Sequence, residues 1–235
     1  MELVTTFGES DLNRMFTRLP SYTEEYRELF GELAQNHSVY IVAGSHLQRV
    51  REQYYNMGHL FTLDGQVWQQ PKLHLFSAER FGNTTPGASL TVIQTEKAKV
   101  SMLICYDLEL PEAARLATLQ GAEILFSPSA TLDEYGYWRV RHCAHARCIE
   151  NQVYVVHCSL VGAVDIAGLS FSDRSSILGP CDRGYPSRGV IAEGPMDQEV
   201  IVTGEADLDL LYSVRENGAS AHPEGPEGGS VAGSL

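Results

Sequence analysis

Residues 100–104 form a run of mostly apolar side chains without Gly or Pro, and this run leads directly into Cys105. Such a run predicts a buried strand. The acidic turn that follows reaches Pro111 and Glu112, two residue types that favour the first turn of a helix. A buried strand that passes through a short turn into a helix predicts an α/β fold, with Cys105 at the junction.

Cys105 has two interpretations at this junction. A thiol between a strand and a helix has backbone N–H groups nearby and a rigid support, as a nucleophile that forms a tetrahedral intermediate requires. A buried cysteine can also serve as a small apolar residue. The stretch alone leaves both interpretations open.

Helical and strand-like patterns alternate along the chain. Apolar residues at three- and four-residue spacing predict a helix over residues 22–36, and Asp64-Gly65 predicts a hairpin turn. This alternation, with hairpins between, predicts an α/β domain with a mixed sheet. The other expected helices are 111–120 and 137–151, and the expected strands are 39–46, 51–63, 90–94, 99–104, 123–128, 153–158, 175–178 and 199–204.

Length and composition limit the possible classes. Residues 1–215 fit one globular domain, whereas residues 216–235 are rich in Gly, Pro, Ser and Ala and are expected to be a flexible tail. The net charge of -13 argues against binding to nucleic acid or to an anionic membrane surface. Five cysteines without a disulfide-framework spacing, and no secretory signal or membrane-spanning run, indicate a reduced, cytoplasmic setting.

Three titratable residues stand beside apolar, strand-like residues: Glu2, Lys72 and Cys105. Together they could form a hydrolytic site, in which the carboxylate takes the thiol proton, the thiolate attacks a carbonyl and the ammonium stabilises the oxyanion. Their spacing alone does not establish that they meet.

Three motifs carry a family resemblance. They are Pro-Lys-Leu-His-Leu-Phe at 71–76, Ile-Cys-Tyr-Asp-Leu-Glu-Leu-Pro-Glu at 104–112, and Trp138 followed by Ala-Arg-Cys-Ile-Glu-Asn-Gln at 146–152. In order and separation they resemble the amidase-like branch of the carbon–nitrogen hydrolase (nitrilase) superfamily, from Glu2 to about Arg215. The resemblance implies a four-layer α-β-β-α sandwich, a Glu-Lys-Cys triad, a homodimer or higher homo-oligomer, and no metal or organic cofactor.

The resemblance also implies roles for residues. Cys105 is then the nucleophile, Lys72 and the Tyr106 backbone N–H stabilise the oxyanion, and Glu2 is the general base and acid. Glu79 is the nearest candidate for a second glutamate in the pocket. The nitrile-cleaving branch usually reads Cys-Trp-Glu where this chain has Cys-Tyr-Asp, so a small amide or carbamoyl substrate is favoured and a nitrile is the alternative.

Several non-catalytic or competing interpretations remain. Lys72 and Glu79 could be solvated side chains, and Glu112 could be a first-turn helix residue or a pocket residue. A cysteine hydrolase that uses His74 or His157 is disfavoured, because no Asn or Asp partner follows in a recognisable pattern. A zinc site is disfavoured because its candidate ligands are poorly placed on one helix and no second cluster exists. Those candidates are His142, Cys143, His145 and Cys148.

The start of the chain departs from the family pattern. Met1 stands where the family has the proline of a Pro-Glu pair, so the N-terminal strand and helix are expected to be missing. Glu2 then lacks the strand that fixes it, and catalytic groups require close placement. The sequence thus predicts an amide hydrolase whose N-terminally incomplete chain has weak or no activity, with a non-catalytic binding protein as the alternative.

Overall fold

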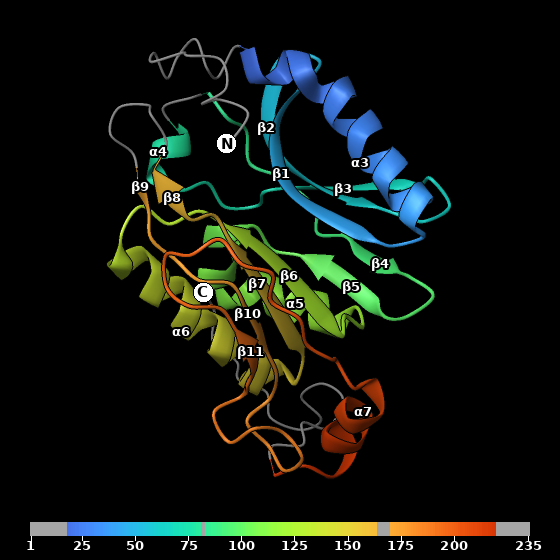
Figure 1. The fold of residues 1–235 in the computed structure, drawn as a ribbon, viewed down its shortest axis with the longest axis vertical. Coiled ribbons are helices and arrows are strands. Elements are labelled where there is room, and N and C mark those ends of the chain that lie inside the picture. The colour runs from blue at the N-terminus through green and yellow to red at the C-terminus, as the bar shows by residue number, and fades with distance from the viewer. Residues whose placement is uncertain (1–17, 81–82, 164–169, 220–235) are drawn as a thin grey trace, which may run out of the picture.

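The computed structural model describes residues 18–80, 83–163 and 170–219, and it has four layers (Figure 1). Helix α3 (Thr23–His37) covers a three-stranded sheet, which packs on a six-stranded sheet, and helices α5 (Pro111–Leu119) and α6 (Glu134–Asn151) cover the far face of that second sheet. The predicted four-layer α/β sandwich is therefore confirmed.

The six-stranded sheet is mixed, in the order β11-β10-β7-β6-β5-β4. Its centre consists of three parallel strands, β5 (Lys99–Met102), β6 (Ile124–Ser129) and β7 (Tyr154–Ser159). Antiparallel strands complete both edges: β4 (Val92–Gln94) on one side, and β10 (Ser176–Leu178) with β11 (Val190–Glu193) on the other. Parallel strands place their carboxyl ends at one edge, and a site built there draws on several loops.

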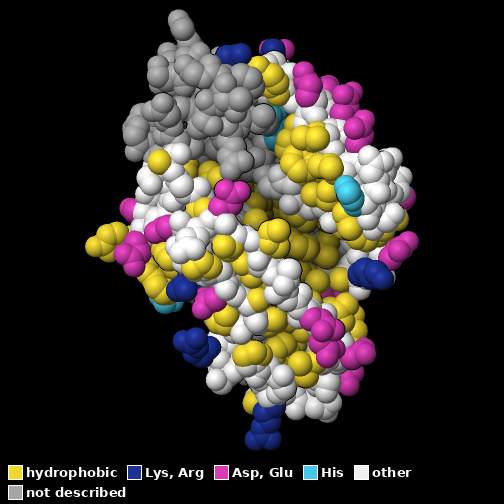
Figure 2. Space-filling model, viewed as in Figure 1, with side chains coloured by type: hydrophobic (Ala, Val, Ile, Leu, Met, Phe, Trp, Pro, Cys, Tyr) yellow, Lys and Arg dark blue, Asp and Glu magenta, His cyan; other side chains and the backbone are white. Residues whose placement is uncertain are grey.

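The three-stranded sheet is an antiparallel meander. It contains β1 (Ile41–Val50), β2 (Gln53–Phe61) and β3 (Val67–Pro71). Gly65 has a φ of 85° in the turn between β2 and β3, where the Asp64-Gly65 pair predicts a hairpin. Acidic side chains of α3 point away from this sheet to solvent, as the magenta atoms at the upper right of Figure 2 show.

Each interface between layers has its own apolar cluster. Tyr26, Ala34 and Phe61 pack α3 onto the smaller sheet. The two sheets meet through residues such as Leu60 and Met102, and Figure 2 shows apolar side chains lining a depression between the two halves of the molecule. The largest cluster packs α5 and α6 onto the six-stranded sheet: Leu103, Leu108, Ala113, Ala114, Ala117, Ala122, Leu125, Val140, Ala144, Cys148, Val153, Val155 and Leu178.

Short elements connect these layers. A 3-10 helix, η1 (Leu19–Tyr22), precedes α3, and a second, η2 (Cys105–Glu109), joins β5 to α5. Helix α4 (Ser77–Arg80) follows β3, and β8 (Gly162–Ala163) pairs with β9 (Ser170–Phe171). In the described part of the chain, no helix is both long and apolar enough to cross a membrane.

The structure corrects the expected strand at 199–204. These residues form no strand in the described structure, and Ile201 is 94% exposed. A β-prone segment becomes a strand only where a neighbouring strand can pair with it, and β11, which was not expected, pairs with β10 at this edge of the sheet.

The C-terminal end of the domain also differs from expectation. Helix α7 (Leu208–Asn217) was not expected, and it extends two residues into the segment interpreted as a tail. Asp207 caps it by accepting a hydrogen bond from the Leu210 N–H. Residues 220–235, and the chain start on which the missing-strand expectation depends, lie outside the described residues.

Candidate active site

Cys105 lies where the sequence predicts, just beyond the carboxyl end of β5. Leu103 still donates a hydrogen bond to the Phe126 carbonyl (2.9 Å), and η2 then begins at Cys105. The φ of Cys105 is 48°, a left-handed conformation that non-glycine residues rarely adopt. Such conformations cost on the order of 1–3 kcal/mol and cluster at functional sites. The packing around η2 must hold this conformation in place.

Helix α6 supplies part of that packing. The buried Arg147 side chain donates from Nε to the Leu108 carbonyl and from Nη2 to the Glu109 carbonyl, both at 3.0 Å. Leu108 itself is fully buried in the largest apolar cluster. The turn that carries Cys105 is thus fixed by polar contacts and by burial.

Lys72 follows the last residue of β3. Its backbone N–H donates to the Asn56 carbonyl and its own carbonyl accepts from the Gly87 N–H, both at 2.8 Å. The Gly87 backbone approaches so closely that an added Cβ would lie 2.7 Å from the Pro71 carbonyl oxygen. The Lys72 side chain is only 4% exposed, so it is not a solvated lysine at a strand end.

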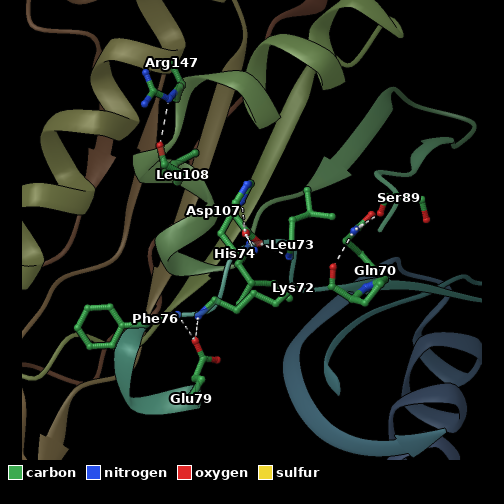
Figure 3. A network of polar contacts seen from close by, with 12 residues as sticks. Gln70, Lys72, Leu73, His74, Phe76, Glu79, Ser89, Asp107, Leu108 and Arg147 are labelled. Atoms are coloured by element: carbon green, nitrogen blue, oxygen red, sulfur yellow. Dashed lines mark hydrogen bonds and ion pairs between the residues drawn. The ribbon is translucent and has the colours of Figure 1, made fainter. Parts of the chain in front are cut away.

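Glu79 is the partner of Lys72. Its Oε2 lies 2.6 Å from Lys72 Nζ and accepts from the Phe76 N–H, while Oε1 accepts from Asn56 Nδ2 at 2.7 Å. Figure 3 shows the Lys72 and Glu79 side chains pointing toward each other. A buried ammonium requires such a partner, because an unpaired charge away from water is costly. The structure therefore holds the Lys72 charge in one place.

The charged groups around Cys105 and its burial shift the pKa of its thiol. Burial raises its pKa, whereas the Lys72 ammonium and a backbone hydrogen bond with Ala130 lower it, and the carboxylates of Glu79 and Glu109 raise it again. Burial is the largest of these effects. The resting group at neutral pH is therefore a thiol, and an attack on a carbonyl requires a base that accepts its proton.

A second acidic residue belongs to the same electrostatic cluster. Glu109, at the end of η2, lies 3.5 Å from the guanidinium of Arg139 on α6. Burial raises the pKa of Glu109, and the charges of Arg139 and Lys72 oppose that rise. This arrangement places an ion pair beside the thiol and the ammonium.

The remaining predicted site residues are placed differently. Tyr106 packs edge-to-face on Phe76, with 5.8 Å between ring centroids, so its ring joins η2 to the segment that follows Lys72. Glu112 is exposed in the first turn of α5, and the structure does not bring it into the buried cluster. Glu2 lies outside the described residues.

Both histidines that were set aside have an aspartate neighbour after all. His74 Nδ1 lies 3.0 Å from Asp107, and the fully buried His157 lies 4.0 Å from Asp173. No sequence pattern identified these two aspartates, because the contacts join residues 33 and 16 positions apart. Burial lowers the pKa of His157 to about 3, so this ring is neutral and poorly suited to accept a proton.

The four candidate zinc ligands have other surroundings. Cys148 is buried in the apolar cluster under α6, and His142 stacks on Trp138. Burial raises the pKa of Cys143 and lowers that of His145. Within residues 18–80, 83–163 and 170–219, no three acidic, histidine or cysteine side chains gather as a metal site.

Sequence reasoning missed Asn56, Glu109 and Asp107 as parts of the site. Asn56 sits inside a strand, where the sequence carries no signal for it. Glu109 and Asp107 stand within the motif after Cys105, and an acidic residue in the midst of apolar ones was the available signal. Asp107 is fully buried, and it contacts both segments of the site.

Comparisons with known proteins match most of the chain. The sequence model of the family described as carbon-nitrogen hydrolase matches residues 2–216. The probable hydrolase YhcX of Bacillus subtilis (strain 168) is 36% identical over 221 residues, or 92% of this chain and 43% of that protein. The (R)-stereoselective amidase of Pseudomonas sp is 36% identical over 164 residues, or 70% of this chain and 56% of that protein. The chain thus spans about half the length of these two relatives.

Solved structures share the fold. The carbon-nitrogen hydrolase from Helicobacter pylori G27 aligns with a TM-score of 0.76 at 26% identity, over 88% of this chain and 75% of that one. Both the sequence and the arrangement of layers are therefore similar to those of carbon-nitrogen hydrolases.

Proposed function

This chain belongs to the carbon–nitrogen hydrolase family, and from that premise we propose that it hydrolyses a carbon–nitrogen bond in a small amide or carbamoyl compound through a thioester on Cys105. The single observation that carries this proposal is the buried Lys72–Glu79 pair, whose ammonium acts on the thiol of a cysteine in a strained turn. A cysteine that served only as an apolar filler would need neither the charge nor the strain.

The proposed first half-reaction begins with the Cys105 thiol. Its sulfur attacks the amide carbon while its proton passes to the Glu2 carboxylate. The resulting oxyanion is stabilised by the Lys72 ammonium and the Tyr106 backbone N–H. The carbon–nitrogen bond then breaks, and the nitrogen leaves as ammonia or amine with the proton held by Glu2.

In the second half-reaction, water replaces the thiol as the nucleophile and Glu2 again transfers the proton. Water attacks the thioester, gives a proton to Glu2, and forms a second oxyanion opposite Lys72. The carbon–sulfur bond breaks, the carboxylic acid leaves, and Glu2 returns its proton to the sulfur. Each cycle thus consumes one amide and one water, and this scheme uses no metal or organic cofactor.

Glu79 supports the chemistry by holding Lys72. Its two oxygens accept from Asn56, Phe76 and Lys72, which fixes the ammonium relative to the strand end. The raised pKa of the thiol supports a separate base in the scheme. Glu2 has that role by resemblance, and Glu79 is the second carboxylate at hand.

An amide or carbamoyl group is favoured over a nitrile as substrate. The turn reads Cys105-Tyr106-Asp107, unlike the Cys-Trp-Glu of nitrile-cleaving relatives. The similar protein from Pseudomonas is named an amidase, which also supports an amide substrate. We further propose a homodimer or higher homo-oligomer, supported by exposed apolar side chains on α5 and α6, and a cytoplasmic setting, supported by five free thiols. Those apolar side chains are Leu116, Leu119, Trp138 and Ile149.

The test is ammonia release from a panel of small primary amides, carbamoyl compounds and nitriles. Cys105→Ala should abolish release, whereas Cys148→Ala, a change of the same type in the apolar cluster, should retain kcat in the folded protein. Ammonia release by Cys105→Ala at the wild-type rate would contradict the thioester route. Release from nitriles alone would replace the amide substrate, and binding without turnover would favour a binding protein.

A further inference from the structure

Asp107 is a fully buried carboxylate that joins the two segments carrying Lys72 and Cys105. Its Oδ1 accepts from the His74 N–H at 2.7 Å and from His74 Nδ1 at 3.0 Å. Its Oδ2 accepts from the Leu73 N–H at 3.3 Å and from the Ile104 N–H at 3.1 Å. Figure 3 shows the carboxylate pointing at the backbone that follows Lys72.

The donors come from both sides of the site. Leu73 and His74 follow Lys72 directly, and Ile104 immediately precedes Cys105. Asp107 itself stands at the third position of η2, so one of its oxygens reaches back to the N-terminal end of its own turn, as acidic residues at helix starts do. The other bonds reach a segment more than 30 residues away in sequence.

We propose that Asp107 is a positioning residue that sets the placement of the Lys72 ammonium relative to the Cys105 sulfur. The inference rests on the proposed function, because it assigns Asp107 to the same reaction. Asp107 does so through the backbone, by fixing the residues adjacent to Lys72 and Cys105 rather than by touching the substrate.

The choice of a carboxylate supports this role. Four donors converge on two oxygens, and each oxygen accepts two of them. An amide side chain offers only one acceptor oxygen, so Asn at this position would leave two of the four donors unpaired: either the two of His74, or those of Leu73 and Ile104. Burial itself disfavours the charge and raises the pKa of Asp107, so the chain retains a costly group here.

A matched carboxylate at the opposite end of the same strands provides the control. Glu123 is 8% exposed and directly precedes β6, where it accepts from the Lys99 N–H at 2.7 Å and from the Tyr212 hydroxyl. It therefore also joins two segments through a backbone N–H. Its bonds hold the amino end of the sheet, away from the turn that carries Cys105.

The experiment compares Asp107→Asn with Glu123→Gln in the full chain. Asp107→Asn should lower kcat per folded active site about 100-fold, because displacements of about 1 Å cost that much, with KM changed less than about threefold. Glu123→Gln should lower the melting temperature and leave kcat unchanged. The proposal is overturned if kcat of Asp107→Asn stays within about threefold of wild type, or if Glu123→Gln loses as much activity.

A second measurement needs no substrate. Iodoacetamide labelling of Cys105 as a function of pH, read by peptide mass spectrometry, should shift to higher pH in Asp107→Asn, because a displaced Lys72 no longer lowers the thiol pKa. An unchanged labelling profile would contradict the proposal. This profile also separates the two claims, since a wild-type protein that cleaves no amide refutes the proposed function and leaves the labelling comparison valid.

His74→Phe covers the case in which Asp107→Asn does not fold. The His74 side chain is 39% exposed, and Phe keeps the ring shape and the backbone N–H while removing one donor to Asp107. This variant should lower kcat about two- to fivefold and shift the labelling profile in the same direction. If neither quantity changes, the proposal fails.

Discussion

The two ends of the central parallel strands use similar residues for different purposes. At the amino end, Glu123 accepts the Lys99 N–H and the Tyr212 hydroxyl, and Arg215 donates to the Ala122 and Gln152 carbonyls. The carboxyl end holds the Lys72 ammonium, which is 4% exposed, and Cys105 in its strained conformation. The fully buried Asp107 carboxylate contacts the segments that carry both.

The difference lies in what each set of contacts stabilises. The amino-end contacts satisfy backbone groups and fasten α7 to the sheet, which is a structural task. The carboxyl-end contacts surround ionisable groups whose charged forms burial disfavours, as the raised pKa values of Cys105, Asp107 and Glu109 record. A group of neighbouring ionisable side chains with shifted pKa values is typical of a functional site.

The largest effect expected from this comparison concerns the two lysines at opposite ends of the sheet. Lys72→Met should lower kcat about 1000-fold, because it removes the proposed oxyanion donor. Lys99→Met changes an exposed lysine at the amino end of β5 and should leave kcat unchanged. Steady-state ammonia release from both purified variants checks the pair, and equal losses would erase the contrast between the ends.

The glutamates of two ion pairs give the next contrast. Glu79→Gln should lower kcat about 10- to 100-fold, because it leaves the buried Lys72 ammonium without its anionic partner. Glu150→Gln breaks an ion pair with Arg147 in which the glutamate is 43% exposed, and it should change stability by less than about 1 kcal/mol. Kinetics and urea unfolding measure both variants. A Glu79→Gln enzyme with wild-type kcat would show that Lys72 needs no fixed partner.

Arg215→Met tests the amino end directly. It leaves two carbonyls without their donor, so the free energy of unfolding should fall by about 2 kcal/mol while kcat stays unchanged. Urea unfolding and ammonia release are measured on the same preparation. A loss of kcat in the folded protein would mean that the two ends are coupled.

The last expected effect is on stability alone, as a pH dependence at the carboxyl half of β7. His157 has a pKa of about 3 in the folded protein against 6.5 in the unfolded chain, so the unfolded chain binds the proton first. Stability is then complete above pH 6.5 and falls as the pH drops toward 3, by up to about 1.4 kcal/mol per pH unit.

His157→Gln should reduce that slope, as urea unfolding between pH 7.5 and 4.5 would show. Asn36→Ala, at the exposed end of α3, removes no titratable group and is the control for the slope. The burial of His46 and His59, which lowers the pKa of each to about 4, leaves a residual slope in both variants. An identical slope in His157→Gln and wild type would place the acid sensitivity elsewhere.

The features that the sequence predicts correctly depend on residues close together in the chain. The helix expected at 22–36 is α3 at Thr23–His37, and the strand-turn-helix junction at Cys105 forms as expected, because periodicity and the Pro111 start are local signals. The expected strand at 199–204 failed because pairing, rather than β-propensity, decides which segment joins an edge.

The site contacts were beyond the reach of such signals. Lys72 and Glu79 are seven residues apart, and hydrophobic periodicity does not predict the path of the chain between them. Asn56 contacts Glu79 from another strand. Asp107 contacts a segment 33 and 34 residues away. Three-dimensional packing sets these distances, so the sequence could name Lys72, Glu79 and Cys105 but not the contacts that hold them in place.

The most direct test of this account is to trap the acyl group. The protein is mixed with an excess of the amide that it hydrolyses fastest and is quenched in acid within the first turnover. The masses of its cysteine-containing peptides are then measured by mass spectrometry. We predict that the acyl mass appears on the peptide that contains Cys105 and is absent from those of the other four cysteines: Cys143, Cys148, Cys158 and Cys181. Turnover without any acyl-Cys105, or an acyl group on another cysteine, would contradict the account.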